Sequence, residues 1–215
     1  MHNFLLFATK NGFVKKTPLE EYTNIRTSGL VAIKLDMNDQ LLDVSPTSGE
    51  DEILLISANG KSILFDETNI RPTGRASRGV KGINLKKGDS VIGMDIIRKD
   101  EATAAQKYEV LVISENGYGK KTRLSEYSRQ GRGGQGVFTA KLSSRTGKLI
   151  DMRLLRHDHE EGEPGTDPHD LLVISIKGQT IRLPVSDVPV LGRHTQGVRI
   201  LKLNSGDRAA ALAIL

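Results

Sequence analysis

The chain has 215 residues, of which 37% are hydrophobic and only 4% aromatic, so aliphatic side chains must fill its core. It has no cysteine, which excludes disulfide bonds, thiolate metal ligands and cysteine nucleophiles, and suits a reducing compartment. No apolar run approaches the roughly 20 residues that span a membrane, and no signal peptide precedes the first apolar run. We therefore expect a cytoplasmic protein without a membrane partner.

Positive charge is unevenly distributed along the chain. The net charge is +5 and the isoelectric point is near 9.4. Residues 156–170 hold one arginine and six acids, so the other 200 residues carry 30 basic and 20 acidic side chains. A body with this excess suits a polyanionic partner, although a lysine-rich solvated surface has the same composition.

In chain order, four apolar runs each lead into a glycine-containing turn. The runs read FLLFAT, ILLISA, VLVISE and LLVISI, and a threonine or serine stands three residues before each glycine. An apolar or tyrosine residue follows each glycine at an offset of ten, so Tyr22 and Tyr127 align with Ile70 and Val188 as core positions. The turn glycines are Gly12, Gly60, Gly117 and Gly178.

A second glycine follows each turn at 17 or 19 residues. An aliphatic residue comes directly after it, and a leucine comes six residues after it. Offsets this regular over four copies indicate a true internal repeat. These glycines are Gly29, Gly79, Gly136 and Gly197.

Each repeat is predicted to be β structure. Asn-Gly between apolar runs favours a hairpin with a two-residue type I′ turn, and the fourth repeat keeps only the glycine. Closing runs such as VIGMDII and LIDMRLL bring each repeat to about four short strands, which is typical of a propeller blade. We expect one all-β, propeller-like domain over 1–215, with blades at about 3–50, 51–107, 108–169 and 170–215.

Basic residues recur at fixed places in the repeat. An arginine precedes the second glycine in every copy, and further basic residues surround it or follow the turn glycine. Equivalent positions of successive blades would share one edge, and a recurring charge would then form a stripe that follows a phosphate backbone. Alternatively, these arginines pair with acids or carbonyl groups between blades. The predicted contacts are Lys15, Lys16, Arg26, Arg71, Arg75, Arg78, Lys81, Lys120, Lys121, Arg129, Arg132, Arg182, Arg193 and Arg199.

No other constellation predicts chemistry in this chain. Histidines and acids between His157 and His169 lie in a loop rich in proline and glycine, a composition typical of solvated loops, so we expect no metal site. The sequence has no glycine-rich phosphate loop and no nucleophile elbow. We predict no catalytic residue and no bound cofactor.

Several phrases resemble the C-terminal domain of the DNA gyrase A subunit, and of its relative in topoisomerase IV. They include ATKNG at 8–12, TSGED at 47–51, ENGYGKKT at 115–122 and GRHTQGV at 192–198. The resemblance covers essentially the whole chain. It implies a six-bladed β-pinwheel with strands exchanged between blades, of which four blades are present here, and a basic outer rim that wraps DNA.

The same resemblance implies a biological setting. The chain would be a non-catalytic part of a type II topoisomerase that consumes ATP with Mg²⁺ elsewhere and introduces negative supercoils. Its partners would be duplex DNA, the gyrase B subunit, which completes an A2B2 assembly, and the remainder of the A subunit, on the bacterial nucleoid. The family's signature heptapeptide, Gln-Lys/Arg-Arg-Gly-Gly-Lys/Arg-Gly, is represented only by QGRGGQG at 130–136, which lacks two basic residues.

Two alternatives remain open from the sequence. The chain could belong to topoisomerase IV, in whose A subunit the rim serves substrate preference more than wrapping. It could also be a propeller-type scaffold that binds proteins through its blade edges, with little salt-dependent affinity for DNA.

Overall fold

The computed structural model describes residues 3–25, 27–99, 108–156 and 169–215. By their internal contacts, the residues form two compact units. The first comprises Met1–Ser57, Ser62–Thr103 and Ser128–Val137, and the second comprises Ala58–Lys61, Ala104–Tyr127 and Phe138–Leu215. The elements of the described residues are β-strands and short 3-10 turns, so the expected all-β repeat fold is confirmed.

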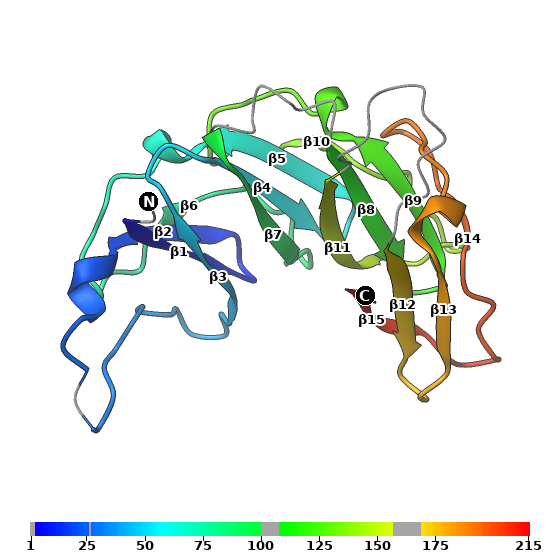
Figure 1. Ribbon diagram of the computed structural model, residues 1–215, viewed down its shortest axis with the longest axis horizontal. Helices are drawn as coiled ribbons and strands as arrows, with labels where there is room; N and C mark the ends of the chain where they lie inside the picture. Colours follow the sequence, from blue (N-terminus) through cyan, green and yellow to red (C-terminus); the bar gives the residue numbers. More distant parts are fainter. Residues whose placement is uncertain (1–2, 26, 100–107, 157–168) are drawn as a thin grey trace. The chain divides into compact units, whose positions relative to one another are not determined.

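The first unit is built on two antiparallel sheets (Figure 1). One has the order β3-β1-β2-β6 and the other the order β10-β5-β4-β7. Both hairpins end in a 3-10 turn, η1 (Leu19–Tyr22) or η2 (Glu67–Asn69). The strands are β1 (Phe4–Thr9), β2 (Phe13–Pro18), β3 (Leu41–Thr47), β4 (Glu52–Ser57), β5 (Lys61–Asp66), β6 (Val80–Lys81), β7 (Val91–Ile97) and β10 (Val137–Phe138).

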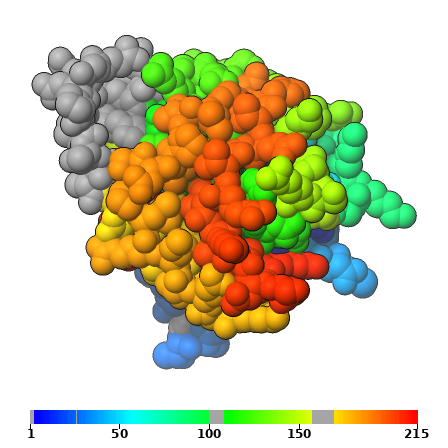
Figure 2. Space-filling model, turned by 90° about the vertical axis from the view of Figure 1, so that its right-hand side faces the viewer, coloured from blue at the N-terminus to red at the C-terminus, as the bar shows by residue number. Residues whose placement is uncertain are grey.

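The second unit carries a sheet of order β11-β8-β9-β14 and a three-stranded sheet of order β13-β12-β15. Its hairpins end in η4 (Leu124–Glu126) and η5 (Val185–Asp187). The atoms of residues 170–215, orange to red, cover most of the face drawn in Figure 2. The strands are β8 (Tyr108–Ser114), β9 (Tyr118–Arg123), β11 (Leu149–Arg156), β12 (Asp170–Ser175), β13 (Thr180–Pro184), β14 (Val198–Arg199) and β15 (Ala209–Ile214).

The outermost short strand of each four-stranded sheet comes from the next repeat along the chain. Strand β6 pairs with β2, β10 lies beside β5, and β14 pairs with β9. The fourth hairpin, β12–β13, has no such strand beside it among the described residues, and its sheet therefore has three strands instead of the four expected. Strand exchange is thus part of the fold, and it places Gly79, Gly136 and Gly197 each on the hairpin of the repeat before it.

The hairpin turns differ from the predicted type I′ form. The N–H groups of Gly12, Gly117 and Gly178 donate to the carbonyl three residues earlier, and only the glycine of each turn has positive φ. This is a three-residue loop, a type I turn followed by a left-handed glycine, so the asparagine before the glycine needs no positive φ. The recurring Thr9, Ser114 and Ser175 close the loop, since each hydroxyl accepts from the N–H after the glycine.

Each unit has its own aliphatic core. In the first, Ile53, Leu55 and Ile63 of the β4–β5 hairpin pack with Leu6 and Val14 of the β1–β2 hairpin. In the second, Leu111 and Ile113 pack with Leu171, Val173 and Val188. Burial of these side chains, at about 25 cal/mol per Å² of apolar surface, is the main stabilising term in both units. Within the described residues, no helix is long and apolar enough to cross a membrane.

Candidate nucleic-acid interface

Three bends carry the recurring arginine within the described residues. We call them the arginine bends: residues 74–79 with Arg75, residues 131–136 with Arg132, and residues 192–197 with Arg193. Arg26, the equivalent in the first repeat, lies outside the described residues. The second glycine ends each bend with positive φ and touches the neighbouring hairpin. A Cβ on Gly136 would lie 2.2 Å from the Ser62 carbonyl oxygen, so only glycine fits there.

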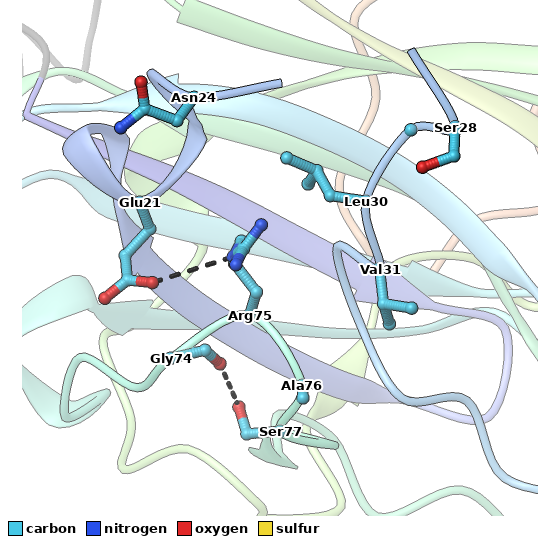
Figure 3. Close-up of a pocket in the computed structure, with 10 residues that line it drawn as sticks. Glu21, Asn24, Ser28, Leu30, Val31, Gly74, Arg75, Ala76 and Ser77 are labelled. Carbon is cyan, nitrogen blue, oxygen red and sulfur yellow. Dashed lines mark hydrogen bonds and ion pairs between the residues drawn. The ribbon is translucent and has the colours of Figure 1, made fainter. Parts of the chain in front are cut away.

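The bend with Arg75 borders an open pocket of about 860 Å³ (Figure 3). Arg75 Nε lies 3.7 Å from Glu21 Oε2, and the arginine side chain is about one-third exposed. Residues 28–31 form the opposite wall. Guanidinium and carboxylate partly neutralise one another, so this bend offers a reduced positive charge to the pocket.

The bend with Arg132 has a different environment. The arginine is exposed, its Nε donates to the Asn69 carbonyl oxygen at 2.8 Å, and its Nη1 donates to the Lys81 carbonyl oxygen at 3.3 Å. Neither partner atom belongs to a carboxylate. These bonds fix the guanidinium and leave its full charge at the surface.

The bend with Arg193 resembles the bend with Arg75. Arg193 Nη1 donates to the Phe138 carbonyl oxygen at 3.1 Å, and the backbone N–H of Arg193 donates to Glu126 Oε2 at 3.1 Å. Glu126 and Glu21 stand nine residues after their turn glycines, the position that Asn69 fills in the second repeat. Two bends thus meet a carboxylate from the preceding repeat, and the third meets a neutral amide residue.

Four of the predicted lysine contacts are buried. Lys15 and Lys120 are 0% and 1% exposed, and Lys16 and Lys121 are 3% and 5% exposed. Lys16 Nζ lies 3.7 Å from Glu67 Oε1, and Lys121 Nζ lies 3.2 Å from Glu109 Oε2. Adjacent lysines of a strand point to opposite faces, and the bends and sheets that lie on these hairpins enclose the ammonium groups of both. Their contact with phosphate stays a prediction that the structure does not favour.

The remaining predicted contacts are exposed, and most of them have partners of their own. Arg78 pairs with Asp36 at 3.0 Å, Arg129 pairs with Glu52, and Arg182 binds Asp170 through two nitrogen atoms at 2.6 and 2.5 Å. The pairing alternative is therefore realised for several side chains that also reach solvent. The exposed set is Arg71, Arg78, Lys81, Arg129, Arg132, Arg182 and Arg199.

The sequence matches the family described as DNA gyrase C-terminal domain, beta-propeller, over residues 3–48, 51–98, 108–156 and 169–215. The chain belongs to this family. It is 39% identical to the DNA gyrase A subunit of Staphylococcus epidermidis and 38% identical to that of Staphylococcus aureus. Both matches run over 211 residues, 98% of this chain and 22% of the relative. The chain thus spans about a fifth of the length of these curated relatives.

Solved structures agree with this family and with the propeller-like fold. The C-terminal domain of DNA topoisomerase IV matches with a TM-score of 0.87 and 27% identity, over 100% of this chain and 62% of that one. The DNA gyrase A C-terminal domain matches with a TM-score of 0.79 and 24% identity, over 98% and 65% of the two chains. At this identity the second likeness shows the fold alone.

In this gyrase-family chain, sequence reasoning missed an aromatic residue and a basic residue that lie together at each of the three strand exchanges within the described residues. Phe13 is paired with Lys81 and lies under Arg78, whose guanidinium carbon is 4.3 Å from the ring centre. Lys61 Nζ lies 3.5 Å from the ring centre of Phe138. The signal was available, because at each of these three exchanges the residue after the turn glycine and the second residue after the next repeat's bend glycine are one aromatic and one basic.

The third such pair has an additional arginine. Tyr118 is paired with Arg199, and its hydroxyl oxygen accepts from Arg199 Nη2 at 3.1 Å and from Arg145 Nε at 2.6 Å. Both guanidinium carbons lie 5.4 Å from the ring centre. Arg145 was absent from the predicted contacts because it stands in the turn before β11, at a position that is not basic in every repeat.

The histidines and acids at 157–163, considered above for metal binding, lie outside the described residues. Within the described part of the chain, no three histidine, cysteine or acidic side chains gather as metal ligands would. Tyr127 is buried in this gyrase-family fold, and its hydroxyl oxygen lies 2.5 Å from Thr139 Oγ1. Burial raises the pKa of Tyr127 to about 12. Tyr127 is therefore a structural residue, as the repeat alignment predicted.

Proposed function

We propose that this chain binds and wraps duplex DNA without sequence preference, as the C-terminal part of a DNA gyrase A subunit. The observation that carries the proposal is the recurrence of an arginine at the same bend of successive repeats, held by backbone carbonyls at Arg132 and Arg193. The excess of 30 basic over 20 acidic residues outside 156–170 also favours a polyanionic partner such as DNA. Membership of the gyrase C-terminal domain family supports the assignment.

Phosphate neutralisation is the physical basis of this binding. Each guanidinium that meets a phosphate releases condensed counterions, so affinity falls steeply with salt and depends little on base sequence. We assign the primary contacts to the arginine bends and to the exposed cations beside them, including Arg145. Phe138 is 41% exposed and has Lys61 above its ring, so this aromatic–cation pair can lie against a sugar-phosphate chain.

The wider setting is part of the same proposal. The chain would contribute four blades of a six-bladed pinwheel, with blade bounds as predicted, and would support ATP-dependent negative supercoiling by the whole enzyme. Its protein partners would be the B subunit together with the remainder of the A subunit, in the cytoplasm. ATP and Mg²⁺ would be used by those other parts, and the chain itself would bind no cofactor and catalyse no step.

A binding titration against salt tests the proposal. The variant in which Arg26, Arg75, Arg132 and Arg193 are alanine is compared with one in which four exposed lysines are alanine, so that both lose four charges. These lysines are Lys10, Lys86, Lys87 and Lys202. With a duplex of about 100 base pairs, the arginine variant should lower the slope of log K against log[salt] by roughly 3 to 4. Equal slopes for the two variants would refute the assignment to the bends.

A topoisomerase IV role is the second candidate, favoured by the likeness to that enzyme's C-terminal domain. Relaxed circles are nicked and religated with the chain bound, and the linking number is then measured. Handed wrapping shifts the linking number and supports the gyrase role. Clear binding without a shift supports the topoisomerase IV role. An absence of salt-dependent binding would leave the protein-scaffold alternative.

A further inference from the structure

Two lysine ammonium groups lie beneath the arginine bends, inside the fold. Lys120 Nζ donates to the carbonyl oxygens of Gly192 at 2.6 Å and Arg193 at 2.9 Å, and to Thr195 Oγ1 at 3.1 Å. All three acceptors belong to one bend. In the first unit, Lys15 Nζ donates to the Arg75 carbonyl oxygen at 2.5 Å and to the Ala32 carbonyl oxygen at 2.6 Å.

These lysines occupy the same place in the repeat. Each stands three residues after its turn glycine, and each reaches the bend of the following repeat. The bend with Arg132 has Ile63 at this place, buried at 0% exposure, with its Cδ1 close to the position a Cβ on Gly134 would take. That bend is held instead by backbone bonds, from Gly133 N–H to the Gly82 carbonyl and from Asn84 N–H to the Gly134 carbonyl.

We propose that Lys15 and Lys120 are positioning residues, whose ammonium groups order the bends of Arg75 and Arg193 so that these arginines meet phosphate at a reduced entropic cost. The inference rests on the DNA-binding function proposed above. It assigns to two lysines of the predicted contact set a role through the bend, without contact to DNA.

The geometry explains why an ammonium is needed there. Carbonyl oxygens of Gly192 and Arg193 point at one centre, an arrangement in which their dipoles repel unless a cation lies between them. A buried hydrophobic residue could fill the volume but could not compensate these oxygens, whose desolvation without a partner is costly. The lysine therefore selects the bent conformation from the conformations that the glycine-rich loop could adopt.

The charges around each ammonium are few. Glu21 and Arg75 face Lys15, and Glu126 and Arg193 face Lys120. Burial lowers the pKa of both lysines to about 8, while the carboxylate raises it and the arginine lowers it further. Both lysines should thus lose their charge around pH 8, where arginine and phosphate keep theirs.

The first experiment is Lys120→Met in the 215-residue chain, with Ile63→Met as the matched control beneath the bend with Arg132. Lys120→Met should weaken binding of a 100-base-pair duplex by roughly 2- to 10-fold, the effect of leaving one long side chain unordered before binding. Ile63→Met should leave affinity unchanged. The free energy of unfolding should fall in Lys120→Met, because the carbonyl oxygens of Gly192 and Arg193 lose their buried donor.

A double-mutant cycle separates positioning from direct contact or general destabilisation. Adding Lys120→Met to Arg193→Ala should cost almost no further affinity, whereas adding it to Arg132→Ala should cost its full effect. Additive effects in both backgrounds would overturn the proposal. The same cycle with Lys15→Met and Arg75→Ala is an independent repetition in the first unit.

Amide hydrogen exchange without DNA keeps the inference distinct from the DNA-binding proposal. In Lys120→Met the amides of residues 193–197 should exchange at least several-fold faster, with the amides of 132–136 unchanged. If the wild-type chain did not bind DNA but this acceleration occurred, the proposed function would fail and the ordering of the bend by Lys120 would stand. If the wild-type chain bound DNA and exchange in residues 193–197 did not change in Lys120→Met, the positioning role of Lys120 would be refuted.

Discussion

The bends with Arg75 and Arg193 differ from the bend with Arg132 in what lies beneath and beside them. The first two have a buried lysine below and a glutamate beside them. The third has Ile63 below and Asn69 beside it. One backbone shape is therefore held in two ways, by an ammonium among carbonyls or by backbone hydrogen bonds over a buried isoleucine. Where the lysine is present, a nearby carboxylate balances its charge and weakens the bend's charge as well.

The largest expected effect tests the steric support of the bend with Arg132. Gly136→Ala should lower the free energy of unfolding by about 3 kcal/mol, since alanine at φ of +68° is strained and its Cβ meets the Ser62 carbonyl oxygen. Gly74→Ala, where a Cβ meets nothing within 4 Å and φ is not positive, is the control. Equal denaturation midpoints for the two variants would show that close packing does not hold this bend.

The next effect concerns the charge that each bend offers to DNA. Arg132→Ala should weaken duplex binding roughly 10-fold and lower the salt slope by about 1, because its guanidinium faces no carboxylate. Arg75→Ala should weaken binding only about 3-fold, since Glu21 already offsets part of its charge. Fluorescence anisotropy at several salt concentrations gives both quantities. A larger loss in Arg75→Ala would reverse the ranking of the two bends.

A smaller effect should follow from exchanging the neighbouring residues. Glu126→Gln should strengthen duplex binding about 2-fold, because the acid that accepts from the Arg193 backbone loses its charge. Asn69→Glu should weaken binding by a similar factor by placing a carboxylate near Arg132. Asp187→Asn, at the same offset in the fourth repeat, serves as the control. Duplex affinity should therefore rise in Glu126→Gln and fall in Asn69→Glu. A change in the same direction in both variants would show that the residue beside the bend does not set the bend's charge.

The last expected effect is on stability against pH. The pKa of Lys120 is about 8 in the folded chain and near 10.5 when unfolded, so the unfolded chain binds more protons between these values. The free energy of unfolding therefore rises with pH as the folded lysine loses its proton. For one lysine the rise is about 1 kcal/mol between pH 7 and 8.5. Urea midpoints should show this rise in wild type and a smaller one in Lys120→Met, while wild-type DNA affinity falls. Parallel pH curves for both proteins would exclude a buried, charge-bearing Lys120.

Much of the fold could be predicted because the repeat depends on patterns of residues that are close in the sequence. The apolar runs before Gly12, Gly60, Gly117 and Gly178 are the inner hairpin strands, and the arginine position before the second glycine is a bend in each described repeat. The turn type was wrong, because Asn-Gly was taken as the whole loop. The hydroxyl of Thr9, which closes a three-residue loop, was the signal that distinguishes the two forms.

The candidate site could be predicted less well. Lys15 and Lys120 each stand beside a second lysine in a strand, and the sequence does not show which segments will lie on the two faces of that strand. Arg145 joins Arg199 at Tyr118 from a distant part of the same unit. Such a cluster depends on the strand exchange, because the exchanged strand brings Arg199 to its aromatic partner.

By itself, the sequence determined the four-fold repeat, the β hairpins, the positions of the arginines and the likeness to the gyrase family, since each depends on residues close in the chain or at fixed spacing. Only the tertiary structure decided which cations face solvent and which are buried. The reason is that each of the first three hairpins is covered by a strand and a bend from the following repeat. The environment of a charge, and with it the pKa and the role of Lys15 or Lys120, is therefore set by residues 60 to 75 positions away.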